Sequence, residues 1–185
     1  WSQTAYAFLD QDAPDTANPS LWRNTQLNHI YGLFEVTDGI YQVRGYDMSN
    51  VTFIKGDTGW IVVDPLMSVE CAQAAFALVE ENLGTFPVKA VIYSHSHVDH
   101  FGGVKGIVSE EEVQAGNVQV IAPEGFEKHA VSENIYAGTA MGRRASYQYG
   151  TMLEGGETGS LAIGIGMGQS KGSTSYISPT LEITQ

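Results

Sequence analysis

The sequence predicts an α/β domain built in layers, and three observations lead to that prediction. Two β-hairpins follow one another between residues 33 and 64. A succession of strand, helix, strand and helix comes after them, which is typical of a layered α/β domain. The composition agrees, because 43% of the residues are hydrophobic and 16% are charged, as in a folded globular protein. The 185 residues are enough for one domain with a substantial core.

Each hairpin is predicted from two apolar runs that flank a turn sequence. The first turn is Thr37-Asp38-Gly39 and the second is Gly56-Asp57-Thr58-Gly59, and both carry the residues that tight turns favour. The flanking runs are residues 33–36 and 40–44 for the first hairpin, and 51–55 and 60–64 for the second. We expect the four strands to form a largely antiparallel sheet.

A helix is predicted over residues 69–83, because Ser68 can cap its start and Gly84 can end it. After it we expect a strand at 88–93, a strand at 118–121, a helical stretch from Pro123 toward Ala140 and a strand at 180–185. Residues 155–159 and 164–168 are too rich in glycine for regular elements. The second of these runs is not a dinucleotide-binding fingerprint, because no strand and helix flank it at the required spacing.

The two ends of the chain lead to expectations about its extent. Residues 1–28 are polar and interrupted by prolines, so we expect an N-terminal arm there, followed by one domain over residues 29–185. Trp1 in place of an initiating Met, and a strand that stops at Gln185, predict a processed or truncated chain.

Charge and hydropathy argue against a nucleic-acid partner and against a transmembrane segment. The net charge of −12 comes from 21 acidic and 9 basic residues. Nucleic-acid binding needs a basic surface, so we expect no nucleic-acid partner. No stretch approaches the roughly 20 apolar residues that span a bilayer, so we expect no transmembrane segment.

The segment Ser94-His95-Ser96-His97-Val98-Asp99-His100-Phe101-Gly102-Gly103 predicts a metal site at the end of a strand. In an extended chain His95 and His97 point to the same side and can bind one ion. Asp99 and His100 follow where the chain turns, so they can bind a second ion. Imidazole and carboxylate ligands suit zinc, with iron or manganese as alternatives. A polar loop with chance histidines is the weaker explanation of three histidines within six residues.

This segment resembles the HxHxDH signature of the metallo-β-lactamase superfamily. The two hairpins and Asp64, at the end of Trp60-Ile61-Val62-Val63, resemble features of the same superfamily. The resemblance implies an αββα sandwich, of which the chain would form the N-terminal portion and be incomplete at its C-terminus. It also implies that Asp64 lies near the metals and supports their ligands; the alternative for Asp64 is a turn cap.

Further segments resemble the alkylsulfatase branch of that superfamily, the SDS-hydrolase type. They are residues 20–23, 26–28, 32–34, 36–47, 59–66, 95–103 and 140–150. The resemblance implies hydrolysis of alkyl sulfate esters to an alcohol and sulfate by a dinuclear zinc site. It also implies a homodimer and an exported enzyme, periplasmic or secreted.

Under this resemblance, His95 and His97 bind one Zn²⁺ ion, and Asp99 and His100 bind the other. Asp99 is in addition assigned as a catalytic residue, beside a bridging water that acts as base or nucleophile. Arg143 and Arg144 are candidate sulfate-binding residues, because a guanidinium offers a planar fork of donors. The alternative is that one arginine pairs with a carboxylate and braces the fold.

The remaining family ligands have no evident source in this sequence. No histidine follows His129, and His129 and His29 are interpreted as surface or packing residues. Glu133 and Asn134 can approach the site or lie on a helix surface. The motif is therefore expected to be half of a metal site. Two alternatives stay open: a hydrolase of the same fold acting on another ester or amide, and an inactive truncated fragment.

Overall fold

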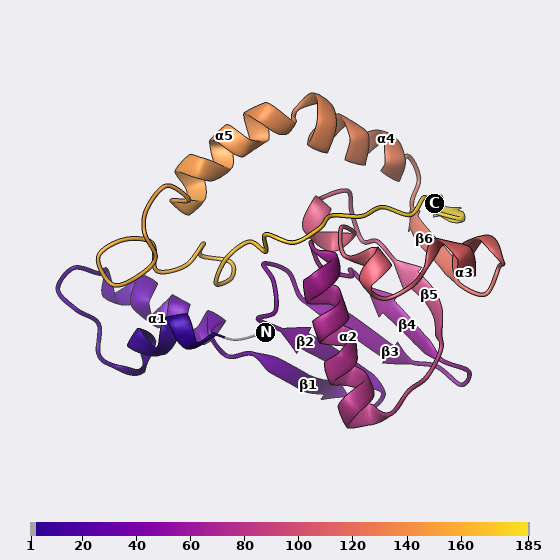
Figure 1. Ribbon diagram of the computed structural model, residues 1–185, viewed down its shortest axis with the longest axis horizontal. Helices are drawn as coiled ribbons and strands as arrows, with labels where there is room; N and C mark the ends of the chain where they lie inside the picture. The colour runs from indigo at the N-terminus through magenta and orange to yellow at the C-terminus, as the bar shows by residue number, and fades with distance from the viewer. Residues whose placement is uncertain (1–2, 185) are drawn as a thin grey trace.

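A seven-stranded β-sheet forms the centre of the computed structural model, which describes residues 3–184 (Figure 1). Its strands lie side by side in sequence order. They are β1 (Gly32–Thr37), β2 (Ile40–Arg44), β3 (Val51–Lys55), β4 (Trp60–Val63), β5 (Val88–Ile92), β6 (Gln119–Pro123) and β7 (Leu181–Ile183). The two predicted hairpins are confirmed as β1–β2 and β3–β4, both antiparallel. From β4 to β7 the pairing is parallel, so the sheet is more mixed than the hairpins alone predict.

Helix α2 (Val69–Leu83) packs on the sheet and confirms the predicted helix. The Ser68 side chain accepts a hydrogen bond from the Cys71 N–H at 3.3 Å, and Gly84 ends the helix with φ of 89°. A positive φ suits glycine, which lacks the Cβ that would clash. Alternate residues of β3 and β4 are fully buried, as one covered sheet face requires. The main core residues of these elements are Val51, Phe53, Trp60, Val62, Ala72, Ala75 and Val79.

The N-terminal segment is more ordered than the predicted arm. It contains a 3₁₀ helix, η1 (Thr4–Asp10), and helix α1 (Pro19–Asn28), which the sequence analysis missed. The Asn18 side chain caps α1, and Pro19 occupies the first helical position, where the missing N–H has no cost. Leu9 and Trp22 pack with Leu161 and Met167 in a small second core. The glycine-rich segment, irregular as predicted, therefore holds the N-terminal segment in place.

Three consecutive helical pieces form an arch over the end of α2 and the sheet (Figure 1, orange). They are α4 (Phe126–Val131), the π-helical turn η4 (Ser132–Tyr136) and α5 (Gly138–Tyr149). The predicted helical stretch is confirmed but extends past Ala140 to Tyr149. The chain then returns beneath the arch toward β7. No residue of α5 is buried. Some of its residues, among them Met141 and Arg144, line the cavity described below.

The observed layers agree with the predicted N-terminal portion of a sandwich, one sheet with helices against it. Three short elements lie between β5 and β6: η2 (Val98–His100), η3 (Val104–Gly106) and α3 (Glu110–Gln114). The helices formed by residues 3–184 include none with the length and apolar character needed to cross a membrane.

Candidate metal centre

The predicted metal ligands and the supporting Asp64 lie at the carboxyl ends of two neighbouring parallel strands. Asp64 follows β4, and the histidine motif follows β5 through Tyr93 and Ser94. In α/β sheets this edge is where binding sites form, because the loops there leave the strands in a shared crevice. Residues that are 30 or more positions apart in the sequence are thereby brought into contact.

The three histidine rings of the motif gather around one point. The centroids of the His95 and His100 rings are 4.0 Å apart, and those of His95 and His97 are 4.6 Å apart. Asp99 is buried, with one carboxylate oxygen 3.1 Å from His100 Nε2. The structure therefore brings together all four residues predicted as metal ligands.

Asp64 orients two of these histidines at once. Its carboxylate accepts hydrogen bonds from the Ser94 N–H at 2.8 Å and the Ser94 hydroxyl at 2.6 Å, and it lies 2.8 Å from His100 Nδ1. Because the Ser94 hydroxyl proton is used on Asp64, Ser94 Oγ accepts from His95 Nδ1 at 2.9 Å. This network places a proton on Nδ1 of both His95 and His100, so Nε2 is the nitrogen that each ring can offer to a metal; in this structure His100 Nε2 is paired with Asp99.

Asp64 adopts a backbone conformation that few residues with a side chain adopt, with φ of 56°. Such strained positions gather at functional sites, where the surrounding structure compensates for the strain. Aspartate tolerates the left-handed region better than most residues. The predicted supporting role of Asp64 is therefore reflected in its contacts, and the turn-cap alternative does not account for its bond to His100.

Burial and neighbouring charges shift the pKa values of His95 and His100 in opposite directions. Burial lowers the pKa of His95, and the nearby His100 and His97 lower it further. Burial also opposes charge on His100, but its hydrogen bonds to Asp64 and Asp99 and their negative charges outweigh burial and raise the pKa of His100 to about 9. For Asp99, burial acts to raise the pKa, while the hydrogen bond to His100 prevails and lowers it.

In the metal-free protein, the raised pKa of His100 predicts stability that falls with rising pH. His100 faces Asp64, Asp99 and His95. Its folded pKa of about 9 lies above the usual 6.5, so the stabilisation is complete below about pH 6.5 and is lost as the pH rises through about 9. The loss is at most about 3 kcal/mol, because water that reaches the partly exposed His100 side chain screens these charges. Urea unfolding between pH 6 and 9.5 measures it; His100→Gln should abolish the slope, and an equal slope in that variant would contradict the assignment.

The residues fit a divalent transition metal by donor type. Three imidazoles and a carboxylate are ligands that zinc accepts, and the bond from His100 Nδ1 to Asp64 is typical of metal-binding histidines. As placed, the donors pair with one another: His100 Nε2 with Asp99, and His97 Nε2 with Glu133 at 3.1 Å. Accordingly, residues 3–184 contain no group of three or more His, Cys, Asp or Glu side chains already set in metal-binding geometry.

Replacing Asp64 with asparagine should weaken zinc binding by about 10–100-fold, as loss of a carboxylate behind a metal-binding histidine does elsewhere. Asparagine tolerates the same backbone conformation, so the fold should persist. Competition with a chelator measures the zinc dissociation constant. Asp38→Asn, in the exposed turn of the first hairpin, is the matched control. Equal zinc affinity in Asp64→Asn and the control would show that Asp64 does not support the ligands.

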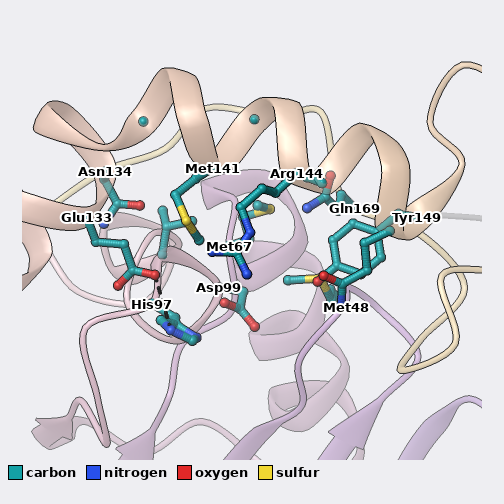
Figure 2. Close-up of a pocket in the computed structure, with 15 residues that line it drawn as sticks. Met48, Met67, His97, Asp99, Glu133, Asn134, Met141, Arg144, Tyr149 and Gln169 are labelled. Atoms are coloured by element: carbon teal, nitrogen blue, oxygen red, sulfur yellow. Dashed lines mark ion pairs between the residues drawn. The ribbon is translucent and has the colours of Figure 1, made fainter.

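A cavity of about 360 Å³ adjoins the motif beneath the arch. His97 and Asp99 line one side of it, and Met141 and Arg144 of α5 line the other. Figure 2 shows Arg144 reaching from α5 toward Asp99. Arg143 does not line the cavity, so the structure separates the two arginines that the sequence left equivalent. Further lining residues include Met48, Met67, Tyr149 and Gln169.

A buried carboxylate that the sequence analysis did not single out holds the cavity together. Asp47 accepts hydrogen bonds from the backbone N–H groups of Met48, Met67 and Ser170, at 2.8–3.1 Å, and from the Ser170 hydroxyl at 2.8 Å. These residues belong to three separate loops. Ser49, next along the chain, hydrogen-bonds to the Asp99 carbonyl. No local sequence pattern identifies such a residue, because its partners are distant in the chain.

Gly102 and Gly103 allow the motif to pack closely against the loop before α2. A Cβ atom on Gly102 would lie 2.2 Å from the Met67 carbonyl oxygen, and one on Gly103 would lie 2.2 Å from that of Pro65. No side chain fits at such distances.

The other sequence candidates divide between the site and the surface. Glu133 reaches His97, whereas the alternative placed it on a helix surface. His129 is exposed on α4, as predicted. The His29 ring packs between Tyr6 and Tyr31, with centroid distances of 5.9 and 5.7 Å, which agrees with a packing role.

Comparisons with known proteins agree with the fold and the motif. Residues 44–176 match the metallo-beta-lactamase superfamily. The chain is 54% identical over 182 residues to a linear primary-alkylsulfatase of Pseudomonas and 49% identical over 186 residues to an alkyl/aryl-sulfatase of Saccharomyces cerevisiae. The solved structure of an inverting sec-alkylsulfatase from Pseudomonas superposes with a TM-score of 0.94 at 49% identity.

These matches cover nearly all of this chain but only part of each relative. The Pseudomonas sulfatase match covers 97% of this chain and 27% of the relative, and the yeast match covers 100% and 29%. The match to the solved structure covers 100% of this chain and 30% of that protein. The chain thus spans less than a third of the length of these relatives. The predicted resemblance to alkylsulfatases and the predicted sandwich fold are confirmed. The chain belongs to the metallo-beta-lactamase superfamily.

Proposed function

We propose that the complete protein hydrolyses linear alkyl sulfate esters to an alcohol and sulfate at a dinuclear zinc site. The observation that carries the proposal is one cavity lined by His97 and Asp99 on one side and by Arg144 on the other. It combines candidate metal ligands with a cation suited to an anionic ester. Similarity to three alkylsulfatases at 49–55% identity supports the substrate class.

The metal ligands divide as the motif predicts. His95 and His97 would hold one zinc ion, and Asp99 and His100 the other. Bound zinc would supply Lewis acidity and lower the pKa of a water molecule. Asp64 holds His100 directly and His95 through Ser94, so the rings keep their Nε2 atoms available. Asp99 is the catalytic carboxylate of this proposal, because it is buried, negatively charged and in contact with both His100 and the cavity.

The cavity walls suit the two ends of an alkyl sulfate. The Arg144 guanidinium can donate two parallel hydrogen bonds to a sulfate group. Met48, Met67 and Met141 provide flexible apolar surface, which adapts to an unbranched chain. Binding at both ends would orient the ester next to Asp99.

The proposal extends to the whole protein in three respects. The predicted division is kept, with residues 1–28 before a domain over residues 29–185, and the remaining metal ligands of that domain lie outside the chain. The complete protein is a homodimer. It is exported to the periplasm or secreted. The boundary at residue 28 follows from the polar, proline-interrupted sequence before it, and the rest follows from the resemblance to alkylsulfatases.

A substrate comparison on the complete, zinc-loaded protein tests the proposal. Dodecyl sulfate should release sulfate, measured by ion chromatography, far faster than a lactam, a lactone or a phosphodiester is hydrolysed. Turnover of one of those three with dodecyl sulfate left intact would support the same fold with another substrate. No turnover of any of the four compounds would contradict the proposed hydrolase activity.

A further inference from the structure

Glu133 is the point at which the arch touches the metal motif. Its Oε1 lies 3.1 Å from His97 Nε2 (Figure 2). Beside it, the Asn134 side-chain amide lies 3.5 Å from the Ser96 carbonyl and hydrogen-bonds to the Ala130 carbonyl at 2.8 Å. Two adjacent residues of the arch therefore face residues 96 and 97 of the motif.

The π-helical turn gives Glu133 this position. The Ala137 N–H donates to the Ser132 carbonyl at 3.0 Å, five residues back, so η4 holds one residue more per turn than an α-helix. Such turns interrupt α-helices, frequently at functional sites. The turn lies between α4 and α5, and it is here that the carboxylate meets His97.

The contact determines which nitrogen of His97 can bind a metal. In the neutral imidazole that binds metals, one nitrogen carries a proton and the other a lone pair. A carboxylate only accepts hydrogen bonds, so Glu133 places the proton on Nε2 and leaves the Nδ1 lone pair free. His95 and His100 have the opposite arrangement, because their Nδ1 atoms face Ser94 and Asp64.

The His97 ring contacts the His95 ring, with centroids 4.6 Å apart, and the Glu133 carboxylate. More than half of its side chain is exposed (57%), whereas the Glu133 side chain is only 25% exposed. In the part of the chain that the structure describes, Glu133 is the only ion-pair partner of His97. A pair this accessible to water contributes little to folding stability. Its effect is on ring orientation.

We propose that Glu133 is a positioning residue that fixes His97 in the Nε2–H tautomer and turns Nδ1 toward the metal. This inference rests on the proposed metal centre. It differs from that proposal in assigning a role to a residue of the arch, outside the histidine motif. The same contact keeps the cavity wall formed by α5 next to the motif.

Two variants and one control test the inference in the complete protein. Glu133→Ala removes the acceptor, and Glu133→Gln keeps an acceptor without the charge. Glu127→Ala, at an exposed position of α4, is the matched control. NMR of ¹⁵N-histidine-labelled, metal-free protein reads the tautomer of His97, and chelator competition reads the zinc dissociation constant.

His97 should be in the Nε2–H tautomer in the parent protein and in Glu127→Ala, and should lose that preference in Glu133→Ala. Zinc binding should weaken by about 10–100-fold in Glu133→Ala, the usual cost of removing such a partner, and less in Glu133→Gln. Thermal stability should stay near that of the control.

A parent protein with His97 in the Nδ1–H tautomer would overturn the inference, as would equal zinc affinity in Glu133→Ala and Glu127→Ala. Failure of the proposed function looks different. A protein that does not cleave dodecyl sulfate, but shows the expected tautomer and zinc affinities, would overturn the substrate and leave the inference standing. The tautomer is read without metal, so it decides the inference even if no zinc binds.

Discussion

Asp99→Asn should lower sulfate release from dodecyl sulfate by more than the roughly 100-fold that loss of a supporting contact costs. The substitution keeps the shape of a buried side chain and removes its negative charge. The proposed zinc site loses an anionic ligand, and His100 loses the carboxylate 3.1 Å from its Nε2. Ion chromatography of sulfate, with zinc in excess, measures the effect.

The control for this substitution is Asp57→Asn, at an exposed position in the turn of the second hairpin. Like Asp99→Asn, it removes one negative charge from the protein, and it should keep full activity. Circular dichroism should show both variants folded. If Asp99→Asn retained a tenth or more of the parent activity, Asp99 would be neither a required ligand nor the catalytic carboxylate.

Arg144→Ala should lower kcat/KM for dodecyl sulfate by about 10–100-fold, because hydrogen bonds to charged groups contribute about 1.5–3 kcal/mol and each 1.4 kcal/mol is tenfold. The loss should appear mainly as a raised KM, since the sulfate is charged before and after the reaction. Arg144→Lys should fall between the parent and Arg144→Ala, because lysine keeps the charge but lacks the planar fork.

Arg143→Ala is the matched control, since Arg143 is the adjacent residue of α5 and does not line the cavity. Its kinetic constants should match those of the parent protein. Equal effects of the two alanine variants would indicate that charge near the cavity matters and that Arg144 makes no specific contact. A larger effect of Arg143→Ala would reverse the assignment.

The parts of the fold that could be predicted have local causes. The turn at Thr37-Asp38-Gly39 defined the first hairpin, and the pair of Ser68 and Gly84 defined the start and end of α2. The convergence of His95, His97, Asp99 and His100 followed from their spacing at a strand end. In each case neighbouring residues in the sequence carry the information.

The parts that were missed depend on contacts between distant segments. Helix α1 has a cap and a proline at its first position, but its polar sequence hides the stripe that Trp22 buries against Leu161 and Met167. Asp47 acts through three loops that meet only in the folded chain. For Glu133 the sequence left two positions open, the site or a helix surface, because no residue pattern in 132–136 predicts the π-helical turn that contains it.

The central claim is that a dinuclear zinc site in this protein drives sulfate ester hydrolysis. It is tested by stripping the complete protein of metal, adding zinc stepwise and measuring sulfate released from dodecyl sulfate at each step. We predict negligible release without metal and a rise that saturates near two zinc ions per chain. Full release by the metal-free protein, or no release at any zinc concentration, would contradict the account.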